Sequence, residues 1–197
     1  MGSIIQVEVG ASIAFSPDSR TIVTVGDDGA AYLWDAVSGY RILLITDAHV
    51  GPILAVSFSP DGRQFVTGGS DGRSQVWDAT SGQLVFALDQ SNSVIKVARF
   101  SPNGAQLATA TADGHLRLWD ANTGAILLEF QACLACAINS VAWRSDGTEL
   151  ATAGDDGFVR QWQVWPSVEA ALAEADYRAG RKLSEPERYL YQIAERP

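Results

Sequence analysis

A repeat of 42 to 43 residues constrains the fold of this chain more than any other feature of its sequence. Four tryptophans mark the period, at intervals of 43, 42 and 43 residues: Trp34, Trp77, Trp119 and Trp162. The aromatic residue that opens the segments FSPDS, FSPDG, FSPNG and WRSDG recurs at the same intervals, at positions 15, 58, 100 and 143. Self-similarity at a period of roughly 20 to 50 residues indicates tandem supersecondary units. The chain is therefore expected to contain four copies of one unit.

The second unit shows what each copy is expected to form. Its short segments 53–58, 64–68, 73–78 and 84–88 alternate with period two and are separated by Pro-Asp-Gly, Ser-Asp-Gly and Ser-Gly turns. Asp-Gly and related pairs between such segments supply the positive φ angles that tight hairpins need. Each unit therefore predicts one four-stranded antiparallel sheet, and the fold class is all-β.

These residues resemble the WD-repeat β-propeller family. The resemblance rests on the FSPDG segment, a strand that ends in Thr and small residues, the Asp-Gly turn and the pair Trp77-Asp78 with its counterparts, and it covers residues 11–163. In that family each unit is one blade, a four-stranded sheet of a propeller. The resemblance implies a propeller segment over residues 1–164 and a separate tail over residues 165–197.

The resemblance also implies a hydrogen-bonded tetrad of His, Ser or Thr, Asp and Trp inside each blade. The second unit matches it in full, with His49, Thr67, Asp71 and Trp77. The other units keep three members each: Thr24, Asp28 and Trp34; Thr109, Asp113 and Trp119; Thr152, Asp156 and Trp162. Their histidine positions fall on Gln6, Ser91 and Leu134. Because an unpaired buried polar group costs roughly 1 to 3 kcal/mol, the second blade is expected to be the firmest.

Four units are fewer than the family usually needs, since its rings close with about seven blades. The resemblance thus implies an open arc with an apolar sheet face exposed at each end. Three arrangements remain open: a terminal part of a longer propeller, assembly with a second copy into a ring of about eight blades, or tight closure as four blades. Because an exposed apolar face beside an unpaired edge strand promotes aggregation, self-association or a partner chain is expected.

The two ends of the chain carry different patterns. Residues 4–9 alternate as a strand would and are a candidate for an outer strand. In the tail, Val168, Leu172, Ala175 and Ala179 recur at helical spacing. Ser184 and Glu187 form a capping-box pattern at the start of a second helix. We expect a helical hairpin, which is similar to the tails of bacterial multidomain WD-repeat signalling proteins.

Composition and charge argue against several functions. The net charge of −9 disfavours nucleic acid as a partner. The sequence has no run of 18 apolar residues, so no membrane-spanning helix is expected. The start of the chain lacks the basic and apolar blocks of an export signal, so a cytoplasmic location is expected.

Catalysis and metal binding are not expected either. There are two histidines and two cysteines, and Cys133 and Cys136 form one C-x-x-C without a second pair for a four-thiolate zinc site. A structural or incidental role is expected for this pair, with a surface thiol pair as the alternative. The Asp-Asp-Gly segments at 27–29 and 155–157 predict hairpin turns, because each offers too few oxygens for calcium. We expect no cofactor, no metal and no enzyme.

In the resembling family, partners most often meet the face that holds the start of the innermost strand and the residue before the tetrad Asp. The matching positions are Val9, Ala11 and Asp27; Pro52, Leu54 and Ser70; Val94, Lys96 and Ala112; and Ala137, Asn139 and Asp155. The partner-binding set is expected to be Asp27, Pro52, Leu54, Ser70, Val94, Lys96, Asn139 and Asp155. The function expected is a non-catalytic scaffold that binds a protein or peptide on this loop face. The alternative is a structural module whose blades complete a larger ring.

Overall fold

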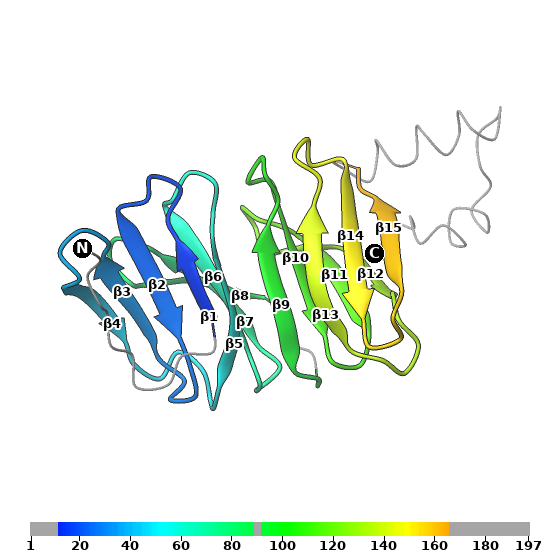
Figure 1. Cartoon of the computed structure of the whole chain (residues 1–197), viewed down its shortest axis with the longest axis horizontal. Coiled ribbons are helices and arrows are strands. Elements are labelled where there is room, and N and C mark those ends of the chain that lie inside the picture. Colours follow the sequence, from blue (N-terminus) through cyan, green and yellow to red (C-terminus); the bar gives the residue numbers. More distant parts are fainter. Residues whose placement is uncertain (1–11, 89–91, 166–197) are drawn as a thin grey trace.

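The computed structural model describes residues 12–88 and 92–165, which form four antiparallel sheets joined in sequence (Figure 1). Blade 1 contains β1 (Ser12–Phe15), β2 (Thr21–Val25), β3 (Ala31–Asp35) and β4 (Arg41–Ile45). Blade 2 contains β5 (Ile53–Phe58), β6 (Gln64–Gly69), β7 (Ser74–Asp78) and β8 (Leu84–Leu88). Blade 3 contains β9 (Ile95–Phe100), β10 (Gln106–Thr111), β11 (His115–Asp120) and β12 (Ile126–Gln131). Blade 4 contains β13 (Ile138–Trp143), β14 (Glu149–Gly154) and β15 (Val159–Gln163).

The all-β prediction is confirmed, and the strands within each blade follow one another as a simple meander. The prediction of four strands per blade holds for blades 1 to 3. Among the described residues blade 4 has three strands, because residues 164 and 165 after β15 carry no strand and the chain beyond them is not described. The expected helical hairpin, the candidate strand at residues 4–9, and Gln6 and Ser91 also lie outside the described residues.

The first hairpin of each full blade is fixed by a short polar network. In blade 2 the Ser59 hydroxyl donates to Asp61 Oδ1 at 2.7 Å and accepts the Gln64 backbone N–H at 3.0 Å. Gly62 closes the turn with a φ of 71°, a conformation that a side chain disfavours. The recurring Ser-Pro-Asp-Gly pattern therefore acts locally, by setting the turn that places two strands in register.

Each blade has two different faces. The tryptophan face carries the Trp of the third strand and the tetrad Thr of the second, as Trp77 and Thr67 do in blade 2. The aliphatic face carries the alternate residues, such as Val66 and Val76. Both faces of blade 2 are buried, which explains why β6 and β7 alternate little in burial.

The aliphatic face of one blade packs on the tryptophan face of the next at all three junctions. Between blades 1 and 2, for example, Val23 and Leu33 share a core with Phe65 and Trp77. At the last junction the Phe130 ring lies 4.5 Å, centroid to centroid, from the ring of Trp162. Tilted aromatic pairs at this separation are favourable beyond their buried area.

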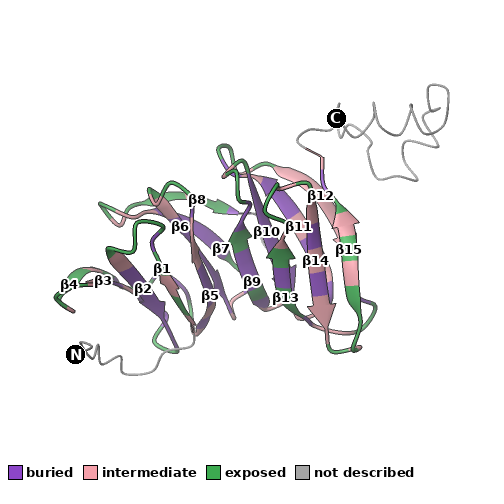
Figure 2. Cartoon of the chain, turned by 45° about the horizontal axis from the view of Figure 1, so that its top comes forward, coloured by how far each residue is buried: buried purple, intermediate pink, exposed green. Residues whose placement is uncertain are grey.

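The two terminal faces lack this cover among the described residues. On the tryptophan face of blade 1, Ile13 and Phe15 are 63% and 59% exposed. Beside the aliphatic face of blade 4, Phe158 and Val159 are 64% and 72% exposed. Figure 2 shows the same contrast, with buried positions filling β7 and β10 while β15 has none. The expected open row of blades is the arrangement observed.

Over residues 12–88 and 92–165, the structure contains no helix with the length and apolar character that crossing a bilayer requires.

Candidate functional site

The innermost strands of all four blades line one depression of about 120 Å³. Four residues show how it is shared: Ser12 comes from β1, Leu54 from β5, Lys96 from β9 and Asn139 from β13. The predicted positions Leu54, Lys96 and Asn139 are therefore brought together, although more than 40 residues separate each from the next.

A backbone irregularity places these three side chains. The ladder between β5 and β6 pairs the residues on either side of Leu54 with Gly69 and Gly68, so Leu54 itself has no opposite partner. The same one-residue irregularity falls at Lys96 in β9 and at Asn139 in β13. A β-bulge re-aims the side chain of the extra residue and is over-represented beside functional sites.

The loop residues around the depression pair within each blade. The Ser70 backbone N–H donates to the carbonyl of Pro52 at 2.8 Å, and the Ala112 N–H donates to Val94 at 2.9 Å. In blade 4 the same pairing joins Asp155 to the carbonyl of residue 137 at 3.0 Å. In blades 2, 3 and 4 the residue before the tetrad Asp thus lies beside the start of the innermost strand.

In blade 1, Asp27 is an exposed residue of the turn between β2 and β3. Its predicted neighbours Val9 and Ala11 lie outside the described residues.

Two cations meet at the depression. Both Lys96 and Arg99 line it, both are exposed, and neither has an ion-pair partner among the residues that the structure describes. The amide of Asn139, which lines the depression, donates to Asp155 Oδ1. Arg99 could not be predicted from the sequence. In a regular strand Lys96 and Arg99, three residues apart, would lie on opposite faces, but the bulge at Lys96 interrupts the alternation and both residues line the depression.

In blade 2 the four tetrad residues His49, Thr67, Asp71 and Trp77 form a continuous chain of hydrogen bonds. His49 Nδ1 lies 2.9 Å from Asp71 Oδ1, and His49 Nε2 lies 2.7 Å from Thr67 Oγ1. The Trp77 indole N–H donates to the same threonine oxygen at 2.9 Å. The network is satisfied when Nδ1 carries the proton and donates to Asp71, so that Nε2 accepts the threonine hydroxyl.

Asp71, His49 and Thr67 copy the order of a hydrolase triad, but they cannot act as one. In such a triad the hydroxyl attacks the substrate after the imidazole takes its proton. Thr67 is fully buried, at 0% exposure, and its oxygen also accepts the Trp77 N–H. A substrate cannot reach this hydroxyl, so the network is structural.

Asp71 shows how the network acts on charge. Burial raises the pKa of this carboxyl, but the opposing hydrogen bonds from His49 and from the backbone N–H groups of Val50 and Arg73 outweigh it. The net result is a pKa below the ordinary value of aspartate. The carboxylate is therefore held in its charged form inside the blade.

Blades 1 and 3 keep the Trp-to-Thr bond but hold the tetrad Asp differently. The bonds from Trp34 to Thr24 and from Trp119 to Thr109 are both 2.9 Å long. In blade 1 the Tyr32 hydroxyl donates to Asp28 Oδ2 at 2.6 Å. Substitution of the histidine is thus compensated from within the blade.

In blade 3, His115 Nδ1 lies 3.2 Å from Asp113 Oδ1, so this histidine contacts the tetrad aspartate rather than standing alone in solvent. The Asp113 backbone N–H donates to Ser93 Oγ at 3.1 Å. The sequence register gave Ser91 as the histidine equivalent of this blade, a residue that is not described.

In blade 4 the predicted equivalent of the histidine is wrong. The register pointed to Leu134, but the Leu134 side chain is 83% exposed to solvent. Cys133 takes the place instead: its Sγ lies 3.2 Å from Asp156 Oδ2, as His49 lies 2.9 Å from Asp71 in blade 2. Cys133 is also buried like His49, at 3% and 5% exposure.

The backbone supports the same equivalence. The His49 N–H donates to the carbonyl of Gly29 at 3.1 Å, and the Cys133 N–H donates to the carbonyl of Gly114 at 3.1 Å. Both glycines hold the same turn position of the preceding blade. The loop of blade 4 has one extra residue, and Ala135 with a φ of 53° accommodates it. Because of that insertion, the sequence repeat pointed to Leu134, one residue after the true equivalent Cys133.

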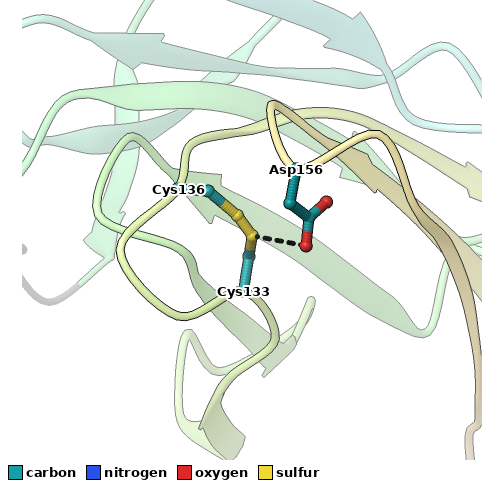
Figure 3. A group of neighbouring side chains, drawn as sticks. All are labelled: Cys133, Cys136 and Asp156. Atoms are coloured by element: carbon teal, nitrogen blue, oxygen red, sulfur yellow. Dashed lines mark hydrogen bonds between the residues drawn. A yellow bond between two sulfur atoms is a disulfide. The ribbon is translucent and has the colours of Figure 1, made fainter.

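Cys133 and Cys136 are joined by a disulfide, which agrees with the structural part of the expectation and not with a pair of surface thiols (Figure 3). Their Cα atoms are 5.5 Å apart, within the range of disulfides. Asp156 lies against the bond, so three potential ligand atoms lie within 4.8 Å of one another. Two sulfurs bonded to each other are not thiolate ligands, so the oxidised pair is not a metal site.

The family whose description reads "WD domain, G-beta repeat" matches the chain four times, at residues 9–35, 41–78, 82–120 and 125–163. The periodic tryptophan protein 2 homolog of Dictyostelium discoideum is 44% identical over 45 residues. This similarity covers 23% of the present chain and 5% of the length of that relative.

Proposed function

Because the chain belongs to the WD40, or G-beta, repeat family, which implies a protein-interaction scaffold, we propose that it is a non-catalytic module that binds a protein segment on its loop face. The observation that carries this proposal is the convergence of three bulged residues, Leu54, Lys96 and Asn139, on one depression. A stiff scaffold that presents irregular backbone to solvent is a frequent arrangement for binding.

The charges of the depression suggest the kind of segment. Lys96 and Arg99 have no ion-pair partner within residues 12–88 and 92–165, although the chain carries a net charge of −9, and half-buried Leu54 adds apolar surface beside them. An acidic side chain or a terminal carboxylate of the partner would pair with the two cations, while an apolar neighbour would contact Leu54. Such charge pairs set register and association rate more than affinity.

The test starts from the full chain and a displayed library of random peptides. Peptides enriched on the chain are expected to place an acidic residue beside an apolar one. The double variant Leu54→Ala/Lys96→Ala should bind them at least about tenfold more weakly by fluorescence polarisation. Arg63→Ala, in the turn at the opposite end of blade 2, serves as the matched control. Peptides that bind the double variant as tightly as the parent chain would refute the loop-face assignment.

A second function rests on a different observation, the two terminal faces that no residue of 12–88 or 92–165 covers. At each junction inside the described part of the chain an aliphatic face meets a tryptophan face. The terminal aliphatic face of blade 4 and the terminal tryptophan face of blade 1 are the same two kinds of surface. A second copy could therefore add head to tail and complete a larger ring, as heterologous contacts do.

Sedimentation equilibrium separates the two functions. The chain is expected to associate reversibly, and Phe15→Glu, which places a charge on the free face of blade 1, should shift it to monomer. Leu54→Ala/Lys96→Ala should leave the mass unchanged. A monodisperse monomer at all concentrations would reject assembly and leave the peptide-binding test unaffected.

A further inference from the structure

Blade 4 holds a pair of cysteines at the position where blade 2 holds a histidine. Cys133 is buried at 3% exposure, whereas Cys136, three residues later, is half-buried and reachable from solvent. One sulfur of the pair therefore contacts the interior of the blade and the other lies within reach of small reagents. This asymmetry suits a pair in which the accessible Cys136 reacts first and the buried Cys133 then resolves the mixed disulfide.

The contact between Cys133 and Asp156 depends on the oxidation state of the sulfur. A thiol carries a proton and can donate it to the carboxylate 3.2 Å away. A sulfur in the disulfide to Cys136 has no proton, so the same contact cannot be a hydrogen bond. In the oxidised blade, Asp156 Oδ2 keeps the Arg160 guanidinium as its partner, at 2.6 Å.

From these observations we propose that Cys133 and Cys136 are a reversible dithiol–disulfide site that exchanges with low-molecular-weight thiols and disulfides. Reduction returns a thiol to the histidine position of blade 4, where it donates to Asp156. Oxidation removes that bond. The site thus modifies the hydrogen bonding of a blade rather than catalysing a reaction.

The chemistry balances with one oxidant, a low-molecular-weight disulfide such as oxidised glutathione. The Cys136 thiolate attacks one sulfur of the reagent, which breaks its S–S bond, forms a mixed disulfide and releases one thiol. The Cys133 sulfur then attacks Cys136 Sγ, which forms the internal disulfide and releases the second thiol. The two cysteine protons end on the two released thiols, and the reagent takes up two electrons.

The order of attack follows from exposure. Cys136 is the more exposed of the two cysteines, so a small reagent reaches it first, and the buried Cys133 then acts as the resolving sulfur.

The first experiment is a redox titration of the full chain. The protein is equilibrated with glutathione buffers of graded potential, acid-quenched, alkylated and weighed by mass spectrometry. We expect one transition between a chain with no alkyl group and a chain with two. Cys133→Ser should stop at a mixed disulfide on Cys136, because the resolving sulfur is gone. Cys136→Ser should form at least about fivefold less mixed disulfide, because Cys133 is buried.

Several outcomes would overturn the proposal. The pair could stay oxidised or reduced across the whole series, or Cys133→Ser and Cys136→Ser could trap glutathione equally. The reduced chain could also bind zinc stoichiometrically and resist alkylation, which would make Cys133, Cys136 and Asp156 a metal site instead.

Hydrogen exchange tests the link to the blade. The backbone N–H groups of Asp155, Gly157 and Phe158 are bonded in the turn that contains Asp156. Oxidation should speed their exchange by about fivefold, the worth of one lost hydrogen bond. In Cys136→Ser, exchange in the turn should no longer depend on the glutathione potential.

The turn at residues 70–73 of blade 2 is the internal control, because His49 rather than a cysteine holds its aspartate. Equal exchange at residues 155–158 in the two oxidation states would overturn the proposed link between the sulfur and the blade.

Discussion

Blade 2 and blade 4 share one sequence pattern but differ in what surrounds them. Their third strands are equivalent, yet β7 is buried at four of its five residues while β15 has no buried residue. The difference comes from neighbours, because within residues 12–88 and 92–165 blade 2 lies between two blades and blade 4 packs on one. In a tandem array the stability of a unit is largely a property of its interfaces. Comparing the two blades therefore distinguishes the stability that comes from the repeat itself from the stability that comes from packing on neighbouring blades.

The same pair of blades differs in how it holds the tetrad aspartate. In blade 2, Asp71 is bonded to a buried imidazole. In blade 4, Asp156 relies on Arg160, which is partly exposed, and on a sulfur that can donate only when reduced. A buried network that is fully satisfied is costly to break, whereas an exposed ion pair contributes little. Mutations at equivalent positions should therefore have unequal effects.

The largest difference is expected at the histidine position. His49→Ala should lower the free energy of unfolding by about 3 kcal/mol, because it leaves Asp71 and the Thr67 hydroxyl without their buried partner. Cys133→Ala under reducing conditions should cost less than about 1 kcal/mol, because Asp156 keeps Arg160. Urea unfolding measured on both variants gives the comparison.

His115→Ala is the matched control for the loss of a histidine, since the His115 side chain is 32% exposed. It should change the stability by no more than about 0.5 kcal/mol. Equal losses from His49→Ala and Cys133→Ala would show that the completeness of the tetrad does not distinguish the two blades.

A smaller difference is expected on the aliphatic faces. Val76→Ala in blade 2 removes two methyl groups from a residue with 0% exposure and should cost about 2 kcal/mol. Val159→Ala on the same face of blade 4, where the residue is 72% exposed, should stay within about 0.5 kcal/mol. Urea unfolding of dilute protein provides the measurement. If Val159→Ala becomes costly as the protein concentration rises, the face is covered by association.

The features that could be predicted from the sequence are the ones set locally and repeated. The 43-residue period, the hairpin turns and the tetrad of blade 2 depend on short patterns such as Ser59 with Asp61, which form the same contacts wherever they recur. The predicted positions Leu54, Lys96 and Asn139 line one depression, and their role in binding stays a prediction. Repetition makes each pattern evidence for the others.

The features that could not be predicted depend on departures from the repeat. One inserted residue in the loop before β13 moved the tetrad position from Leu134 to Cys133, and Ala135 gives no sequence signal of the left-handed turn that it adopts. Arg99 was missed because the bulge at Lys96 interrupts the alternation of β9. One sequence signal of the insertion was the loop before β13, residues 133–137, which is one residue longer than the equivalent loop of blade 2, residues 49–52.

The smallest effect is expected for the pH dependence of the stability that Asp71 contributes. The pKa of Asp71 is lowered in the folded chain, since its hydrogen bonds outweigh its burial. A lowered pKa means that the unfolded chain takes up the proton first, so this stabilisation is complete above the ordinary pKa of aspartate and is lost as the pH falls through the folded value. The difference in unfolding free energy between the parent chain and Asp71→Asn should therefore shrink as the pH falls below the ordinary pKa of aspartate, about 3.9.

Asp156→Asn is the counterpart in blade 4. The hydrogen bond from Arg160 lowers the pKa of Asp156, so its contribution has the same sign, but its exposure allows salt to screen it. Chemical unfolding across the pH series, at low salt and in about 1 M salt, should show a salt-sensitive difference for Asp156→Asn and a salt-insensitive one for Asp71→Asn. If both differences respond to salt alike, the aspartate of blade 2 is no better shielded than that of blade 4, and the contrast between a buried and a partly exposed network would have to be abandoned.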